Sequence, residues 1–164
     1  MADFTHKTFI KHDDYMTPKS AWGAIQHLVP KDKVIWECFY GDGESGKILT
    51  ELGYTVIHEP IDFYKENRGD ILLSNPPYSD CKNIMPRLKA LGKPFVMLMP
   101  SSKINTQYFR DSFKGEDIQI IIPAKRINFI KLKDGKKQET NSCNFDCFYY
   151  CWKIGLEKDI TWLE

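Results

Sequence analysis

The chain has 164 residues, 42% hydrophobic and 27% charged, and this composition predicts a single globular domain over residues 1–164. Its formal net charge of +1 excludes polyanion binding through overall positive charge, so any nucleic-acid surface must be a local patch. No apolar run has the length of a membrane span and no secretory signal begins the chain, so we expect an intracellular protein without membrane contact.

The first predicted element is an extended arm over residues 1–16 that leads into a helix. Thr17 is a suitable N-cap and Pro18 suits the first helical position. Apolar residues at helical spacing, Trp22 among them, carry this helix to about Pro30.

Residues 34–40 predict a buried strand, which runs into Gly41-Asp42-Gly43 and then a helix. Strand, glycine turn and helix in this order form the first unit of a nucleotide-type sheet, where glycines let the backbone approach a ligand. No third glycine at dinucleotide spacing and no Gly-Lys-Ser/Thr pair follow, which disfavours a phosphate site. Glu37 suits a ligand's ammonium group, although a solvated acid beside a tight turn has the same pattern.

A second strand over residues 54–59 ends on Glu59, and a carboxylate there can accept both hydroxyls of a ribose. Asp62 follows three residues later, as a second ligand-binding acid or as part of a plain surface loop. We expect no catalytic role for His58.

Residues 70–73 predict a third buried strand, and Ser74-Asn75-Pro76-Pro77-Tyr78-Ser79 follows at its carboxyl end, where open α/β sheets bind ligands. The prolines stiffen the turn and leave its carbonyls free of local donors. The Asn75 side chain and the Pro76 carbonyl could together hold both hydrogens of a planar amino group, while Tyr78 offers a face for stacking an extruded base. An ordinary turn after a strand is the alternative.

The next elements alternate again, as helix 80–91 with a break or kink at Pro86, strand 94–100, helix 102–113 and strand 118–123. This alternation predicts an α/β fold, a Rossmann-like doubly wound and mostly parallel sheet with three layers.

The tail predicts an antiparallel hairpin at the C-terminal end, in which residues 126–132 turn at 133–137 into an aromatic strand ending at Trp152. The lysines at 131, 133, 136 and 137 could meet phosphates or simply be solvated. Cysteines 143, 147 and 151 recur every four residues without a further ligand pair, so we expect reduced thiols and no metal site.

Three motifs therefore occur in order along the chain: Tyr-x-Thr-Pro from Tyr15, Glu-x-Phe-x-Gly-x-Gly from Glu37, and Asn-Pro-Pro-Tyr from Asn75. Together they resemble the amino-methyltransferases that use S-adenosyl-L-methionine, most of all the small DNA adenine-N6 methyltransferases of phages and large viruses. The resemblance implies methyl transfer to the exocyclic N6 amine of adenine in DNA, with S-adenosyl-L-homocysteine as the product. One departure is that Glu59 and Asp62 lie almost adjacent, whereas a helix usually separates these two family motifs.

The resemblance also implies roles for individual residues. The implied catalytic residues are Asn75, Pro76, Pro77 and Tyr78. The implied cofactor-binding residues are Tyr15, Thr17, Pro18, Glu37, Phe39, Gly41, Gly43, Glu59, Ile61, Asp62 and Asn75. The implied substrate-binding residues are Tyr78, Ser79, Arg126 and Phe129.

Other substrates and roles remain open at this point. Asn-Pro-Pro-Tyr also occurs in enzymes that methylate adenine in RNA or a glutamine amide of protein release factors. A non-catalytic subunit with the same fold is a further alternative. Because little protein remains to recognise a DNA sequence, we expect a short or relaxed target, a homodimer or a helper subunit.

Overall fold

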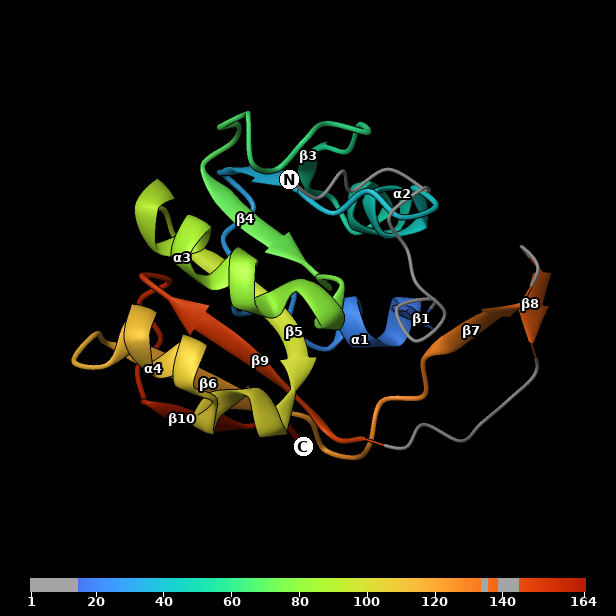
Figure 1. Cartoon of the computed structure of the whole chain (residues 1–164). Coiled ribbons are helices and arrows are strands. Elements are labelled where there is room, and N and C mark those ends of the chain that lie inside the picture. Colours follow the sequence, from blue (N-terminus) through green and yellow to red (C-terminus); the bar gives the residue numbers. More distant parts are fainter. Residues whose placement is uncertain (1–14, 134–135, 139–144) are drawn as a thin grey trace.

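Figure 1 shows the fold as a computed structural model, which describes residues 15–133, 136–138 and 145–164. For residues 15, 131–133 and 136–138 it describes the backbone alone. The first fourteen residues of the predicted arm, and Cys143, lie outside the described residues.

A seven-stranded mixed sheet forms the centre of the molecule, with the strand order β10-β6-β9-β5-β4-β2-β3. Its strands are β2 (Val34–Trp36), β3 (Thr55–Ile57), β4 (Ile71–Ser74), β5 (Phe95–Pro100), β6 (Ile118–Ile122), β9 (Cys147–Trp152) and β10 (Ile160–Trp162). All neighbouring pairs are parallel except those that β9 makes with β5 and β6. The prediction of an α/β fold with a mostly parallel sheet is therefore confirmed.

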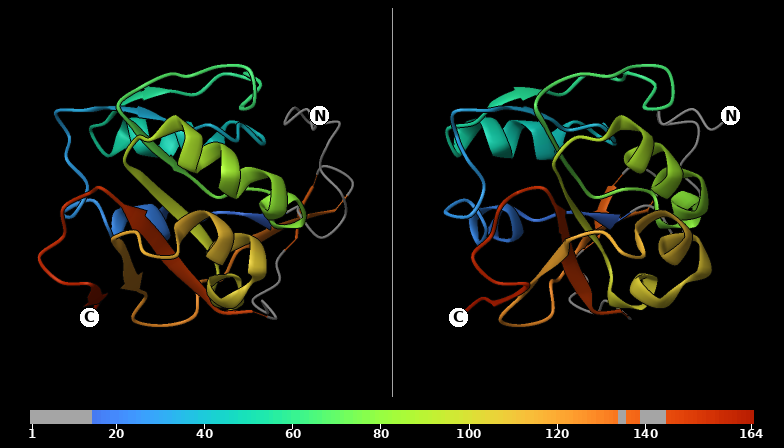
Figure 2. Two further views of the ribbon diagram at one scale, coloured as in Figure 1. Left: turned by 60° about the vertical axis from the view of Figure 1, so that its left-hand side comes forward. Right: turned by 90° about the vertical axis from the view of Figure 1, so that its left-hand side faces the viewer.

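Helices cover both faces of this sheet, as Figure 2 shows. The helices are α1 (Lys19–Gly23), α2 (Glu44–Glu51), α3 (Cys81–Leu91) and α4 (Gln107–Phe113), with short 3-10 turns η3 (Tyr78–Asp80) and η4 (Ser101–Asn105). Alternate residues of a strand point to opposite faces. Along β5, Phe95 and Met97 accordingly pack in one cluster with α3 and α4, while Val96 and Leu98 pack in another with α1 and α2.

The antiparallel component at the C-terminal end is confirmed, but β9 has different partners from the predicted hairpin. The hairpin consists of β7 (Ile130–Lys133) and β8 (Lys136–Gln138), and it forms a separate small sheet with β1 (Tyr15–Met16). β9 instead lies between β5 and β6. An interior position suits β9 because Tyr149 and Tyr150 are buried on opposite faces of the sheet.

The first helix begins one residue later than predicted. Pro18 is the N-cap, with φ −72° and ψ 156°, so Thr17 does not cap α1 and its side chain is buried instead. The helix ends at Gly23, and turns replace its predicted second half. Among the described residues, no helix is long and apolar enough to cross a membrane.

Candidate active site

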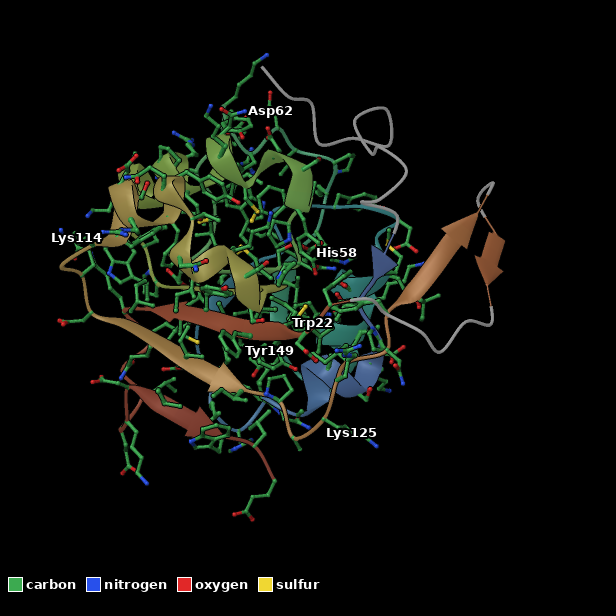
Figure 3. All side chains as sticks on the ribbon, turned by 60° about the horizontal axis from the view of Figure 1, so that its bottom comes forward. Trp22, His58, Asp62, Lys114, Lys125 and Tyr149 are labelled. Carbon is green, nitrogen blue, oxygen red and sulfur yellow. The ribbon has the colours of Figure 1, made fainter. Side chains whose placement is uncertain are left out.

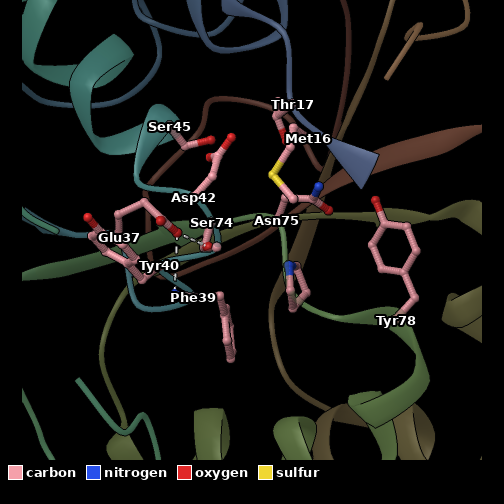
Figure 4. Close-up of a pocket in the computed structure, with 12 residues that line it drawn as sticks. Met16, Thr17, Glu37, Phe39, Tyr40, Asp42, Ser45, Ser74, Asn75 and Tyr78 are labelled. Atoms are coloured by element: carbon pink, nitrogen blue, oxygen red, sulfur yellow. Dashed lines mark hydrogen bonds between the residues drawn. The ribbon is translucent and has the colours of Figure 1, made fainter. Parts of the chain in front are cut away.

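A cleft opens where β2 and β4 end, at the carboxyl edge of the parallel strands (Figure 4). Its walls come from β1, from the turn after β2 and from the turn after β4. The cleft is narrow, with a cavity volume of about 20 Å³. The lining residues are Met16, Thr17, Glu37, Phe39, Tyr40, Gly41, Asp42, Ser45, Ser74, Asn75, Pro76 and Tyr78. The structure thus brings members of all three sequence motifs to one place.

Glu37 is the most unusual residue of this cleft, because it is a carboxyl group with only 1% of its surface exposed. Its Oε1 atom accepts hydrogen bonds from the Phe39 backbone N–H at 3.3 Å and from the Ser74 hydroxyl. Its Oε2 atom is buried and has no hydrogen-bond partner among the described residues. Burial raises the pKa of Glu37 to about 8, and nearby Asp42 contributes in the same direction, although the bonds from Ser74 and Phe39 oppose the shift.

A buried oxygen without a donor is costly, and a ligand that supplies one relieves the cost. Glu37 also lines the cleft. This carboxyl group therefore suits a cationic group with N–H donors, such as an ammonium.

The turn after β2 has a backbone that requires glycine. Gly41 and Gly43 have φ values of 60° and 80°, and the Gly43 N–H donates to the Tyr40 carbonyl at 2.9 Å. A Cβ atom on Gly43 would lie 2.7 Å from the Tyr40 hydroxyl oxygen. Asp42 Oδ1 accepts the Glu44 N–H at 3.0 Å, which joins the turn to the start of α2. Gly43 therefore leaves room for the Tyr40 side chain, which itself lines the cleft.

The Asn-Pro-Pro-Tyr turn forms the opposite wall. Pro77 is extended, with φ −66° and ψ 114°, and Tyr78 begins the short turn η3. The Tyr78 ring is buried and lies perpendicular to Phe145 at a centroid distance of 5.5 Å. Its hydroxyl oxygen is 3.9 Å from Cys147 Sγ. Asn75 and Tyr78 share the cleft with Thr17, whose buried Oγ1 has no partner in the described part of the chain.

The predicted ribose and adenine residues lie outside this lining. Glu59 is exposed, and Ile61 is half-buried against the cluster that contains α3. Asp62 accepts the Tyr64 N–H at 2.9 Å and lies 3.9 Å from Lys65 Nζ, at the outer rim of the molecule (Figure 3). The structure does not bring these residues into contact with the cleft.

Residues 58–70, which connect β3 to β4, contain neither helix nor strand, as the nearly adjacent acids lead one to expect. Phe63 anchors this connection because its buried ring packs 4.7 Å from the ring of Phe39. Arg87 donates to the carbonyls of Phe63 and Glu66 at 3.2 and 2.8 Å. The connection is therefore fixed against the sheet despite its irregular backbone.

The remaining predicted residues lie around the cleft. Pro18 follows Thr17 but lines a second, larger hollow, and Ser79 is exposed beside Tyr78. Arg126 donates to both carboxylate oxygens of Asp146, at 2.7 and 3.0 Å, and this pair lowers the pKa of Asp146. The backbone of Tyr15 pairs with β7 in the small sheet.

Phe129 has a role that the sequence alone does not indicate. It is buried, and its ring packs 5.7 Å from that of Phe145, which in turn contacts Tyr78. Phe129 therefore supports the ring stack behind Tyr78 and does not line the cleft.

Five lining residues were not predicted: Met16, Tyr40, Asp42, Ser45 and Ser74. Most have no motif of their own, since Met16 and Ser45 could occur in any strand or helix. Ser74 carries a recoverable signal, because a serine that ends a run of buried apolar residues needs a polar partner. Here that partner is Glu37.

No family model and no curated protein matches this chain. The most distinctive polar feature of the cleft is Glu37 Oε2, a buried oxygen that has no donor among the described residues.

Proposed function

We propose that the protein transfers a methyl group from S-adenosyl-L-methionine to the N6 amine of adenine in DNA. The observation that carries the proposal is the joint placement of Glu37 and Asn75 in one cleft. Glu37 offers a buried, partly unsatisfied carboxyl group for an ammonium. Asn75 and its prolines offer acceptors for a planar amine. The cleft thus offers a carboxyl group for the ammonium of the methyl donor and hydrogen-bond acceptors for the amine that receives the methyl group. These two features match the two substrates of the reaction.

The proposed fold is the Rossmann-like, doubly wound sheet with three layers. It is supported by the order of the parallel strands and by the helices on both faces. The cleft at the carboxyl edge also supports it, since such sheets bind ligands there. We propose an intracellular location for the enzyme.

Glu37 would accept the ammonium of the cofactor, and the hydrogen bonds from Ser74 and Phe39 hold its carboxyl group in place. Gly41 and Gly43 would allow close approach of the backbone. Glu59 would accept the ribose hydroxyls of the part of the cofactor that extends beyond the cleft lining. When bound, the cofactor supplies an electrophilic methyl group on a sulfonium.

Asn75 Oδ1 and the Pro76 carbonyl would accept the two N–H groups of adenine N6, which orients the nitrogen lone pair toward the methyl group. This pairing also draws electron density onto the nitrogen. Tyr78 would stack on the extruded base. Phe145 meets the Tyr78 ring edge to face, so the ring is held before the base arrives.

The test is transfer of a labelled methyl group to duplex DNA, single-stranded DNA, RNA and protein in parallel, at saturating cofactor. The controls are Asn75→Ala and Asn83→Ala, the second being an exposed asparagine on α3. We expect label in DNA as N6-methyladenine, lowered by at least about 100-fold in Asn75→Ala and unchanged in Asn83→Ala. Label in RNA or protein would reassign the substrate. No transfer, together with no cofactor binding, would contradict the proposal.

A further inference from the structure

Strand β10 forms one edge of the main sheet (Figure 1). It carries an unusual amount of exposed apolar surface. In the described part of the chain, the exposed large hydrophobic side chains are Ile104, Ile160 and Trp162. Two of them lie on β10, with 49% of Ile160 and 70% of Trp162 exposed. Proteins usually protect an edge strand with charges, prolines or a covering loop, so an apolar open edge indicates a contact surface.

Among the described residues, β6 is the strand that pairs with β10, and it does so along one edge of β10. On the inner side, Ile120 N–H donates to the Asp159 carbonyl at 2.8 Å and Leu163 N–H donates to the Ile122 carbonyl at 2.9 Å. Successive residues of a strand direct their N–H and C=O groups to opposite edges. The backbone groups of Ile160 and Trp162 therefore face outward, away from β6.

A hollow of about 310 Å³ adjoins this edge on the face that α4 covers. Its lining includes Ile104, Phe109, Phe113, Ile118, Ile120 and Ile160. The parallel register places Ile160 beside Ile120 and Trp162 beside Ile122. Ile160 lines the apolar hollow and so joins it to the edge, whereas Trp162 borders a second hollow that Ala21 and Tyr149 help to line.

We propose that β10 pairs antiparallel with β10 of a second copy of the chain, around a two-fold axis at Thr161. In this register Ile160 lies opposite Trp162 of the second copy, next to the hollow, and each copy makes the same contact. The outward backbone groups of Ile160 and Trp162 form the hydrogen-bonded pairs. Lys158 comes opposite Glu164 of the second copy, so the ends of the pairing carry opposite charges.

The segment is therefore complementary to itself in shape, hydrogen bonding and charge. Pairing joins two seven-stranded sheets into one continuous sheet. Because the paired strands are antiparallel, the two clefts lie at opposite edges of that sheet. Each protomer keeps a complete cleft of its own, and the dimer does not depend on the proposed methyl transfer.

A disulfide cross-link tests the register. Thr161 of one copy lies opposite Thr161 of the second copy in a non-hydrogen-bonded pair. The Cα atoms of such a pair are about 4.5 Å apart, which is within the range of a disulfide. In a Cys143→Ser background, we expect Thr161→Cys to form a covalent dimer under mild oxidation. Thr55→Cys, on the exposed edge strand β3 at the other end of the sheet, should remain monomeric on a non-reducing gel. Absence of the Thr161→Cys dimer would overturn the register.

Sedimentation equilibrium tests the contacts. We expect the wild-type chain to dimerise and Trp162→Lys to remain monomeric at the same concentration, with an unchanged far-UV circular dichroism spectrum because this side chain is exposed. Lys158→Glu should raise the dimer dissociation constant about tenfold, and Lys158→Glu with Glu164→Lys should restore it. Lys82→Glu, an equal charge change on α3, should have no effect. A monomeric wild type, or a charge reversal without restoration, would refute the proposal.

Discussion

Two neighbouring strands of the sheet, β2 and β3, are each followed by a glutamate, and the two glutamates have opposite environments. Glu37 follows β2 directly and is 1% exposed, with a pKa raised to about 8. Glu59 follows β3 by one further residue and is exposed. The difference arises because β2 lies between β3 and β4, whereas β3 is the edge strand of the described sheet and pairs there with β2.

The neighbours of β2 surround Glu37 from both sides. Ser74, at the end of β4, donates to its carboxyl group, and the Glu37 N–H donates to the Ile57 carbonyl of β3 at 3.0 Å. In the part of the chain that the structure describes, no strand lies on the outer side of Glu59. Of these two acids at strand ends, the one that follows an interior strand is therefore desolvated, and the one that follows an edge strand is not. The comparison predicts that neutralising Glu37 changes stability and ligand affinity strongly, whereas neutralising Glu59 changes them little.

The largest expected effect is on stability, through Glu37→Gln. The folded, ligand-free protein keeps the Glu37 proton up to about pH 8, whereas the unfolded chain releases it near 4.5. The folded state thus binds the extra proton between these values, so stability falls as pH rises through this window. Glu37→Gln removes this loss, and the variant should gain on the order of 4 kcal/mol over the wild type above pH 8.

Urea unfolding at acidic and alkaline pH measures this effect. Glu59→Gln is the matched control, since an exposed acid has no desolvation to relieve, and its pH dependence should follow that of the wild type. If Glu37→Gln and the wild type lost stability in parallel as the pH rose, burial of Glu37 would not be the cause of the loss of stability at alkaline pH.

A second comparison sets Gly43, in the turn before α2, against Gly53, in the turn after it. Both have positive φ, 80° and 101°, so alanine is strained at either position. A Cβ on Gly43 would also meet the Tyr40 hydroxyl at 2.7 Å, while the nearest atom to one on Gly53 is Lys31 Nζ at 3.7 Å. We expect Gly43→Ala to cost about 2–3 kcal/mol and Gly53→Ala about 1 kcal/mol.

Denaturant midpoints of the two glycine variants check this order. Gly43→Ala should also weaken binding of S-adenosyl-L-methionine, because the turn borders the cleft. Equal costs at the two positions would show that Tyr40 moves freely and that the turn is not rigid.

The smallest effect is expected for Glu59→Gln on cofactor affinity. Hydrogen bonds from ribose hydroxyls to an exposed carboxylate contribute about 1 kcal/mol, so the affinity should fall about fivefold. Glu157→Gln, another exposed acid outside the cleft, should leave it unchanged. Fluorescence titration with the cofactor would measure the affinity of both variants. A 100-fold lower affinity of Glu59→Gln would show that the exposed glutamate contributes as much to binding as the buried one.

Much of the sheet could be predicted because its interior strands are uninterrupted apolar runs. Residues 94–100 predict β5, and every residue of β5 is buried. The position of β9 could not be predicted, since local pattern does not specify which strand a buried strand pairs with. β10 was missed because it has three residues, with both of its large hydrophobic side chains exposed.

The site was predictable where backbone chemistry is specific, as at Gly43 with its positive φ and at the Asn-Pro-Pro-Tyr turn. The polar contacts of the cleft were not predictable, because Ser74 meets Glu37 across 37 positions of sequence. The burial of Glu37, and hence its raised pKa, likewise depends on the strand order. The sequence therefore indicates several side chains that belong to the cleft, but not their burial, their hydrogen bonds or their pKa values.

The central claim is that Glu37 receives the ammonium of S-adenosyl-L-methionine. Calorimetric titration at about pH 7, where the α-amino group of the cofactor still carries its charge, tests it with two ligands, the cofactor and methylthioadenosine, which lacks the ammonium. We predict that Glu37→Gln weakens cofactor binding about 100-fold and leaves methylthioadenosine binding unchanged. No cofactor binding by the wild type, or equal losses for both ligands, would contradict the account.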